Sequence, residues 1–309
     1  MQFTVPESLS GQRIDMLLSR RFTYRSRTGW QQEIRNGNIS INGTPGLVPH
    51  RKVLPGDVIE YNAREHQEPP VDVNYEILYR DDHMVVVSKP GDLPTHPSGV
   101  YFNNTLTRLL ERDTGEALVP LHRLDRETSG VIILARHRQH VHPLRKSLME
   151  GKKEYTAIVG GVPSWDSMVV DTPLGPDTAS VVRKKRAAYR GAPESALTEF
   201  ILLRACANCA LVRALPRTGR LHQIRAHLLY LGHPVIGDKL YGGDESWFLH
   251  FIEKGLTPSL VQALGMERCA LHAEYCTLVH PFTGKKMTFH APLPHDMNEY
   301  MCSAEDVNG

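Results

Sequence analysis

Apolar and polar positions near the start of the chain follow two periods, one helical and one extended. Residues 14–18 and 28–35 carry apolar side chains at helical spacing, and the second of these runs stops at an Asn-Gly pair. Residues 38–43 alternate like a strand, and 58–61 predicts another short strand after a Pro-Gly turn. The pattern predicts a small α/β domain over residues 1–62.

A polar segment with consecutive prolines then separates this unit from a strand-rich region. Residues 63–72 lack apolar periodicity and predict a linker. Apolar runs predict strands at 84–88, 131–135, 155–159, 198–204 and 210–216. Helices are predicted between them at 105–113, 139–150 and 221–231. Because the two types do not alternate regularly, the fold class is α+β rather than α/β. We expect the large domain over 73–296 and a loose tail over 297–309.

Composition narrows the class of protein. The 309 residues are 41% hydrophobic and 23% charged, as in ordinary globular proteins. No apolar run is long enough to span a bilayer, and the N-terminus lacks the basic segment and apolar core of a secretory signal, so we expect a cytoplasmic protein. The net charge of +2 excludes a strongly basic binder, so any nucleic-acid surface must be local.

Two groups of residues invite a metal-binding interpretation. The five cysteines, an odd number, fit reduced thiols, and Cys206 and Cys209 form a CxxC that would flank a hairpin turn without a suitably spaced second pair. His137, His140 and His142 are poorly spaced for one metal ion. We therefore expect no metal site.

A charged loop before an apolar strand is the first candidate for chemistry. Asp125 lies between Arg123 and Arg126, and neighbouring cations keep a carboxylate ionised. An ionised carboxylate can act as nucleophile or base. The alternative is that Asp125 caps a turn, helped by Thr128 and Ser129.

A second candidate segment follows a predicted strand and opens a helix. Residues 218–228 place His222 and Arg225 one helical turn apart, away from the apolar face. Arg225 could pair with a carboxylate in a cleft, and the alternative is a surface ion pair.

Together the two segments belong to an ordered series of motifs that resembles the RluA-like family of pseudouridine synthases. The matching motifs are Val86–Pro97, His122–Gly130, Lys153-Glu154-Tyr155, Thr218–Leu228, Gly232–Asp238 with Tyr241-Gly242, Leu271-His272-Ala273 and His280–Gly284. The resemblance covers about Val73 to Pro294 and implies a mixed, largely antiparallel sheet with a central cleft. It also implies that no cofactor is needed, because substrate and product are isomers.

The resemblance carries roles onto particular residues. Asp125 is implied to be the catalytic carboxylate, Tyr155 to stack on the uracil, and Arg225 to pair with the aspartate. Arg123 is implied to fill the gap left when the base is flipped out of its helix. Substrate or RNA contacts are further expected from residues in the same two motifs, namely His122, Thr128, Arg220 and His222. The alternatives are that Tyr155 packs in the core and that Arg123 contacts phosphate.

The N-terminal unit resembles the small RNA-binding domain first seen in a ribosomal protein of the small subunit. The motifs that carry this likeness are Arg13-Ile14-Asp15, Arg25-Ser26-Arg27, Ile34–Gly37, Ile41–Gly43 and Pro55-Gly56-Asp57. The resemblance implies a basic helix face on the RNA backbone, with Arg25, Arg27 and Arg35 among its residues. The alternative is a solvated basic surface. A second basic run, Arg183–Arg186 with Arg190, lies in a predicted loop and is open to the same two interpretations.

The sequence thus predicts an enzyme that isomerises uridine in RNA, most simply large-subunit ribosomal RNA, with transfer RNA as the alternative substrate. A monomer is expected. One rival is an RNA-binding assembly factor that keeps the fold without the chemistry. Another is a glycoside hydrolase, which needs a second carboxylate, and Glu127 is the nearest candidate.

Overall fold

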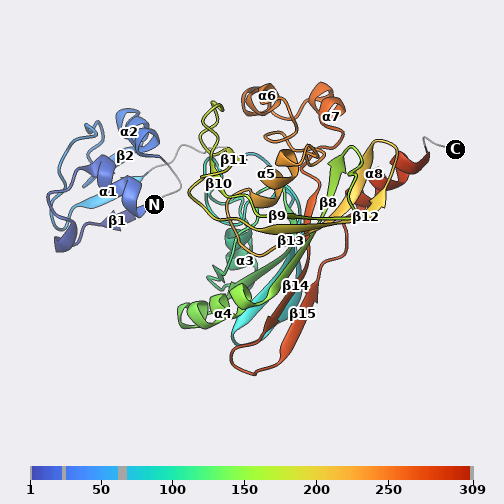
Figure 1. Ribbon diagram of the computed structural model, residues 1–309. Coiled ribbons are helices and arrows are strands. Elements are labelled where there is room, and N and C mark those ends of the chain that lie inside the picture. The colour runs from blue at the N-terminus through green and yellow to red at the C-terminus, as the bar shows by residue number, and fades with distance from the viewer. Residues whose placement is uncertain (1, 23–25, 62–67, 307–309) are drawn as a thin grey trace. The chain divides into compact units, whose positions relative to one another are not determined.

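The computed structural model describes residues 2–22, 26–61 and 68–306, which form two compact units (Figure 1). One consists of Met1–Val71 and His96–Leu109, and the other of Asp72–Thr95 and Leu110–Gly309. The predicted boundaries near 62, 72 and 296 stay predictions, and each unit is described below by itself.

The first unit packs two helices on a small antiparallel sheet. Its elements are β1 (Gln2–Thr4), a 3-10 turn (Glu7–Leu9), α1 (Ile14–Arg21), α2 (Arg27–Arg35), β2 (Ile39–Ile41) and β3 (Val58–Tyr61), with strand order β1-β3-β2. Ser26 caps α2 by accepting a hydrogen bond from the N–H of Gly29. The predicted helices and strands are confirmed, and their apolar faces, with Trp30 at the centre, form one buried cluster.

Asp15 ties the two helices of this unit together. Its buried carboxylate accepts hydrogen bonds from Arg13, Arg27 and Gln31 at 2.8–3.0 Å. Burial alone would raise the pKa of Asp15, but these donors outweigh it and lower the pKa to about 2. Arg27, an expected RNA contact, is therefore already in an ion pair, although its side chain stays 48% exposed.

The second unit is built on one large sheet. Its strands are β4 (Glu76–Arg80), β5 (Met84–Lys89), β6 (Val119–Pro120), β7 (Ser129–Ala135), β8 (Lys152–Gly160), β9 (Ser167–Val170), β12 (Thr198–Ala205), β13 (Cys209–Pro216), β14 (Leu271–Val279) and β15 (Lys286–His290). The main path is β4-β5-β7-β14-β8-β13-β12-β9, with β6 on β7 and β15 on β14. Among the described residues β7 and β14 form the one parallel pair. The predicted mixed, largely antiparallel α+β fold is confirmed, and its central cleft stays a prediction.

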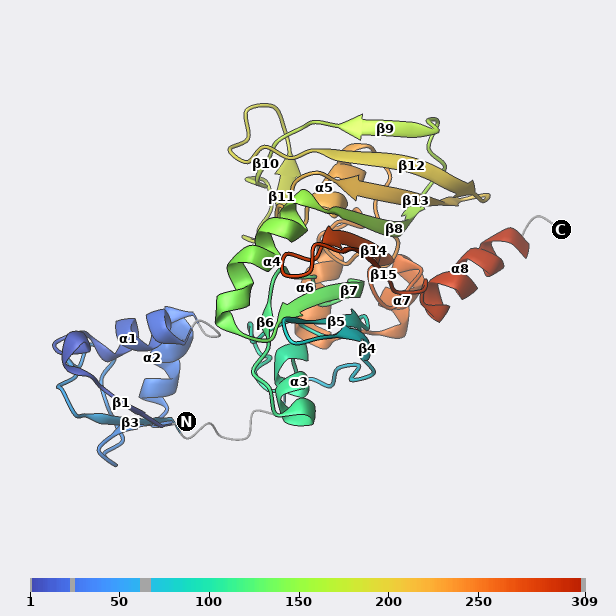
Figure 2. The ribbon, with the colours of Figure 1, turned by 90° about the horizontal axis from the view of Figure 1, so that it is seen from below.

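Helices lie on both faces of this sheet (Figure 2). They are α3 (Leu106–Thr114), α4 (Arg138–Glu150), α5 (Gln223–Tyr230), α6 (Ser246–Lys254), α7 (Pro258–Leu264) and α8 (His295–Asp306). Leu144 and Leu148 of α4 join an apolar cluster with residues of β5, β7 and β14. Ile224 and Leu228 of α5 join a different one with β8 and β13. No helix in the described part of the chain is both long enough and apolar enough to cross a membrane.

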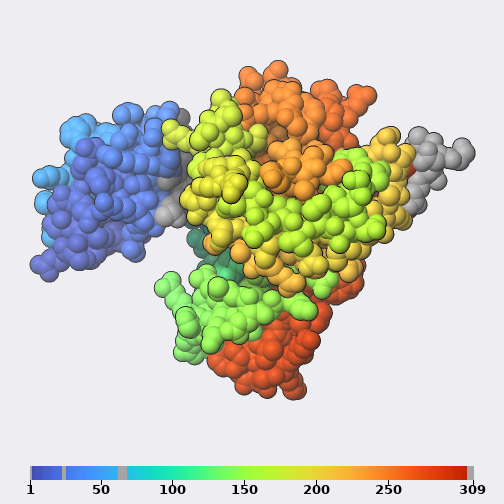
Figure 3. Space-filling model, in the orientation of Figure 1, coloured from blue at the N-terminus to red at the C-terminus, as the bar shows by residue number. Residues whose placement is uncertain are grey.

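The C-terminal segment corrects one prediction. The tail from 297 is not loose where it is described, because α8 covers His295–Asp306 and buries Met297 and Met301 in the cluster of β8 and β13. Its apolar residues at 297, 300, 301 and 304 have helical spacing, so the signal was present in the sequence. Helices α6 and α7 were not predicted. No residue of α6 is buried, and the orange atoms of these two helices lie open on the surface in Figure 3.

A short two-stranded sheet and one tight turn complete the second unit. Strands β10 (Leu174–Pro176) and β11 (Arg186–Ala188) pair with each other and with no other strand of the described chain, and Leu174 also forms a β-bridge to Glu194. Cys206 and Cys209 flank the β12–β13 turn as predicted, with the Cys206 N–H donating to the Cys209 carbonyl at 2.9 Å.

Gly130 allows β7 to approach β14 closely at the start of the parallel pairing. Its φ is +110°, and an added Cβ would lie 2.2 Å from the Ala273 carbonyl oxygen. A residue with a side chain cannot occupy this position without moving β14. The glycine after Thr128-Ser129 therefore fixes where β7 begins and where the preceding loop, which carries Asp125, lies against the sheet.

Candidate active site

The loop that carries Asp125 is fixed on both sides of the aspartate. The N–H of Thr128 donates to the Asp125 carbonyl at 3.2 Å, closing a turn. Before it, the Leu124 carbonyl accepts from the Thr95 hydroxyl at 3.0 Å. After it, the Arg126 carbonyl accepts from the Lys89 ammonium at 3.1 Å. The expected turn around Asp125 is thus present, and the aspartate's own side chain stays available for other contacts.

Lys89 joins this loop to the end of β5. Its ammonium is 1% exposed and donates to the carbonyls of Pro90 and Leu93 at 2.7 and 2.8 Å, besides that of Arg126. Burial, followed by the charge of Arg268, lowers the pKa of Lys89 to about 7. A single side chain therefore ties together two of the predicted motifs.

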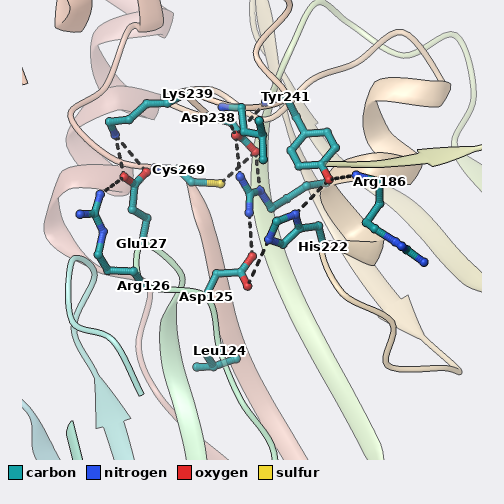
Figure 4. A network of polar contacts seen from close by, with 12 residues as sticks. Leu124, Asp125, Arg126, Glu127, Arg186, His222, Asp238, Lys239, Tyr241 and Cys269 are labelled. Carbon is teal, nitrogen blue, oxygen red and sulfur yellow. Dashed lines mark hydrogen bonds and ion pairs between the residues drawn. The ribbon is translucent and has the colours of Figure 1, made fainter. Parts of the chain in front are cut away.

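The Asp125 carboxylate is the first of three charged groups that contact one another in series (Figure 4). Arg225 donates from Nη1 to Asp125 Oδ2 at 2.7 Å, the expected pairing. The other side of the guanidinium is clamped by Asp238, with Nε to Oδ2 at 2.6 Å and Nη2 to Oδ1 at 2.8 Å. Such a two-bond pair fixes the plane of the guanidinium and thus the direction in which Nη1 points.

Asp238 is itself held in place by several donors. Its side chain is fully buried, and Oδ1 accepts from the backbone N–H groups of Leu240 and Tyr241 at 3.0 Å. The thiol of Cys269 lies 3.6 Å from Oδ2. Because a buried carboxylate without partners is costly, these contacts explain how a second charge is accommodated behind Arg225.

The environment keeps Asp125 ionised. Burial raises its pKa, but the charge of Arg225 and its hydrogen bond, with a further contribution from His222, outweigh burial, and the net pKa lies below the ordinary value. Its Oδ1 atom has no hydrogen bond within the described residues, and His222 Nε2 lies 3.9 Å from it. One carboxylate oxygen is therefore bound, and the other is open.

His222 faces this open oxygen from the residue before α5. Its backbone is left-handed, with φ of +56°, and its Nδ1 lies 3.0 Å from the Tyr241 hydroxyl. Burial and then the nearby Arg225 charge lower the pKa of His222 to about 4, so the ring is neutral at neutral pH. The Tyr241 ring also covers the Arg225 guanidinium at 4.8 Å.

Tyr155 lies on β8 and pairs with Ala273 of β14, which in turn pairs with Gly130 of β7. Burial, together with the Cys276 and Asp125 charges, raises its pKa, so the phenol stays protonated. Its ring also packs partly against the cluster of β8 and β13, so the core interpretation describes part of its surroundings.

The remaining expected contacts of the second unit differ in how available they are. His122 Nε2 accepts from the Ile133 N–H at 3.2 Å, and burial lowers its pKa to about 3, so this ring binds the strand backbone. Thr128 is buried. Arg220 is exposed but donates to the Ser195 carbonyl at 3.0 Å. Arg123 is exposed, and no ion pair is seen for it in the described chain.

Glu127 belongs to a separate network. It pairs with Lys239 at 2.9 Å and Arg126 at 2.7 Å and accepts from the Cys269 N–H at 3.0 Å. These donors occupy both carboxylate oxygens of Glu127. The glycoside hydrolase interpretation, which requires Glu127 as an acid, loses its second group.

The basic residues outside this centre are only partly free. Arg35 is exposed on α2, and Arg25 lies outside the described residues. In the basic run near β11, Lys185 is near Asp177 and Glu245, and Arg186 pairs with Glu194. The exposed members of that run are Arg183, Lys184 and Arg190.

Asp238, Tyr241 and Lys89 were not singled out from the sequence for a role at the site. Each lies in a segment that the family resemblance covers, so the motif was visible. The partner of each residue was not, because Asp238 is 113 residues from Asp125 and meets it only through Arg225.

Comparison with known proteins agrees with the geometry. The model of the family described as RNA pseudouridylate synthase matches residues 83–230. The ribosomal large subunit pseudouridine synthase D of Vibrio cholerae is 34% identical over 96% of this chain and 92% of its own length. The protein of that name in Escherichia coli strain K12 is 32% identical over 96% and 91%.

Solved structures give the same result. Human RNA pseudouridylate synthase domain containing 4 superposes with a TM-score of 0.57 and 28% identity, over 73% of this chain and 91% of that one. Human RNA pseudouridylate synthase domain containing 1 shares the fold, with a TM-score of 0.56 and 22% identity over 77% and 97%. The chain therefore belongs to the family of RNA pseudouridylate synthases, enzymes that isomerise uridine in RNA.

Proposed function

We propose that this protein converts specific uridines of large-subunit ribosomal RNA to pseudouridine, with Asp125 as the catalytic residue. The observation that carries the assignment to Asp125 is the division between its two oxygens. Oδ2 is bound by Arg225, whereas Oδ1 has no hydrogen bond among the described residues. An ionised carboxylate with one open oxygen suits each course that the reaction can take: attack on the ribose carbon, attack on the uracil ring, or abstraction of a sugar proton.

The neighbouring side chains support distinct steps. Tyr155, a protonated phenol that pairs with the same residue of β14 as Gly130 does, offers a π-face to an extruded uracil. Arg225 keeps the carboxylate charged and in place. Arg123, exposed beside the aspartate in sequence, is free to occupy the space that a flipped base leaves, and unstacking that base costs a few kcal/mol.

The ribosomal target rests on the relatives. Proteins named ribosomal large subunit pseudouridine synthase D align with nearly the whole of this chain, including the N-terminal unit. We further propose that this unit contacts RNA through the basic side chains of α2, Arg27 and Arg35, and through Arg25. Phosphate contacts release counterions, so the affinity for RNA should fall steeply with salt, and less steeply in an Arg35→Ala variant.

The reaction itself suggests the remaining properties. Uridine and pseudouridine are isomers, so we propose that no metal or organic cofactor takes part. We propose that the protein acts as a monomer in the cytoplasm, and light scattering on the purified chain tests the first of these two statements.

Release of tritium from carbon 5 of uridine tests the function. Ribosomal RNA labelled at that position should lose tritium to water with the wild type and with Asp82→Ala, a control at an exposed aspartate. Asp125→Ala should lose this release and keep its affinity for RNA. Release that persists in Asp125→Ala would remove Asp125 from the mechanism.

Two other outcomes bear on the substrate. Release of tritium from transfer RNA instead of ribosomal RNA would change the proposed substrate and would leave the proposed reaction unchanged. No release from either RNA, with binding retained, would favour the assembly factor.

A further inference from the structure

A hydrogen-bond donor and an acceptor face each other at the open side of the site. His222 Nε2 and Asp125 Oδ1 are 3.9 Å apart, which is too long for a direct hydrogen bond. His222 is nearly covered, with its side chain 12% exposed, and Asp125 is 24% exposed. The two atoms are therefore neither joined to each other nor freely solvated.

The hydrogen bonds of Tyr241 decide which nitrogen of His222 carries the proton. The Tyr241 hydroxyl oxygen accepts from the Arg186 backbone N–H at 2.8 Å, and its other polar contact in the described chain is His222 Nδ1 at 3.0 Å. Tyr241 is fully buried, so its hydroxyl proton needs an acceptor, and a backbone N–H cannot be one. The proton therefore goes to Nδ1, and a neutral ring then carries its own proton on Nε2.

A hydroxyl group matches this pair. The oxygen of a hydroxyl accepts from Nε2–H while its proton is donated to the carboxylate, whereas a uracil carbonyl only accepts and a uracil N–H only donates. An oxygen at about 2.8 Å from both atoms fits between positions 3.9 Å apart. Within an RNA strand, the free hydroxyl of an internal nucleotide is the ribose 2′-OH.

We propose that His222 and Asp125 together bind the ribose 2′-OH of the flipped uridine, with Tyr241 as the positioning residue that fixes the Nε2–H form of His222. This inference rests on the proposed function, because it places the target nucleotide at Asp125. It assigns the site a means of selecting ribose over deoxyribose at the reacting nucleotide. It also fixes one end of the sugar beside the catalytic oxygen.

The test compares two RNA fragments that differ in one atom. Each carries the mapped target, as uridine or as 2′-deoxyuridine, and the dissociation constant is measured for each fragment with each variant. Losing the hydroxyl removes one bond from a neutral donor and one to an ionised carboxylate, so the wild type should prefer the uridine fragment by about tenfold or more. Any effect of the deoxy sugar on the RNA itself is common to all variants and cancels in the comparison.

Two substitutions at His222 separate the donor from the ring. In His222→Gln, the side-chain amide reaches the position of Nε2, and the preference should be largely kept. In His222→Asn the amide reaches only the position of Nδ1, so the preference should fall by about threefold to tenfold, to the part that the Asp125 carboxylate supplies. Equal preferences in His222→Asn and the wild type would overturn the proposal, whatever the affinity of either variant for RNA.

A third substitution tests the relay. Tyr241→Phe removes the hydroxyl that donates to Nδ1 and should weaken the preference, whereas Tyr79→Phe, which loses a hydroxyl bonded to Asp81, should not. An unchanged preference in Tyr241→Phe would remove Tyr241 from the proposal.

Tritium release by the same preparations distinguishes a failure of this inference from a failure of the proposed function. Wild type that releases tritium but shows no dependence on His222 refutes this inference alone. Wild type that fails to release tritium refutes the proposed function.

Discussion

Replacing Asp238 by asparagine should disable the site without touching the residue that reacts. Asp238 contacts Arg225 through two hydrogen bonds, and Arg225 contacts Asp125 through the third. An asparagine side chain keeps one acceptor and turns its NH₂ group toward an arginine N–H, so two donors meet. The guanidinium then loses the clamp that directs Nη1 at Asp125.

The magnitude follows from burial. Removing one partner of a fully buried ion pair costs about 3–5 kcal/mol in folding free energy, because the other charge stays uncompensated. Displacement of a catalytic group by about 1 Å costs about 100-fold in rate. We expect kcat for tritium release to fall about 100-fold, with KM for RNA changed by less than about threefold, since Asp238 is inaccessible to RNA.

A pH profile distinguishes this effect from general damage. Burial is the largest influence on the pKa of Asp125, and Arg225 opposes it. If Arg225 leaves Asp125, burial prevails and the acid limb of kcat moves to higher pH. A fold that is merely less stable would lower the melting temperature and leave the acid limb where it was.

The chain contains a matched control. Arg268 and Asp296 form a pair of the same geometry, with Nε to Oδ2 at 2.6 Å and Nη2 to Oδ1 at 2.8 Å. Asp296 is 43% exposed, so Asp296→Asn should cost about 1 kcal/mol or less and leave kcat intact. A folded Asp238→Asn protein with kcat within threefold of the wild type would refute the reasoning.

Three further predictions concern other parts of the second unit. The lowered pKa of Asp125 means that kcat should stay level as the pH falls from 7 to about 5, and a half-maximal rate above pH 6 would contradict it. Lys89 has a pKa of about 7 in the folded protein and 10.5 in the unfolded chain, so between these pH values the unfolded chain binds more protons. The free energy of unfolding therefore increases as the pH rises. Urea unfolding at pH 7 and pH 9 should show a smaller increase in Lys89→Met than in the wild type. Gly130→Ala sets a Cβ against the Ala273 carbonyl at a positive φ, and should lower the free energy of unfolding by about 2 kcal/mol or more, measured by the same titration.

Local patterns in the sequence predicted much of the secondary structure. Strand β7 is a largely apolar run buried on both faces, and α4 and α5 show helical spacing over 13 and 8 residues, which leaves little ambiguity. Helix α6 was not predicted because all its apolar residues are partly or fully exposed, so it has no clear buried stripe.

Pairing across the sheet was beyond local reasoning. Strand β14 lies between β7 and β8, although it follows them by more than a hundred residues, and the parallel step from β7 to β14 has no signature in either strand. The same holds for the site. Family motifs predicted the Asp125–Arg225 pair, but the clamp by Asp238 and the contact of His222 with Tyr241 depend on how three segments of the chain meet.

The arrangement also answers a chemical difficulty. A direct, two-bond ion pair with arginine would keep Asp125 ionised but would occupy both of its oxygens and weaken it as a nucleophile or base. Here Asp238 takes the two-bond contact, and Asp125 receives a single hydrogen bond on Oδ2. The arginine therefore supplies enough charge to overcome burial and lower the pKa of Asp125, while Oδ1 stays open toward the substrate. Of the two carboxylates that share this arginine, the buried Asp238 is structural, and the partly exposed Asp125 can react.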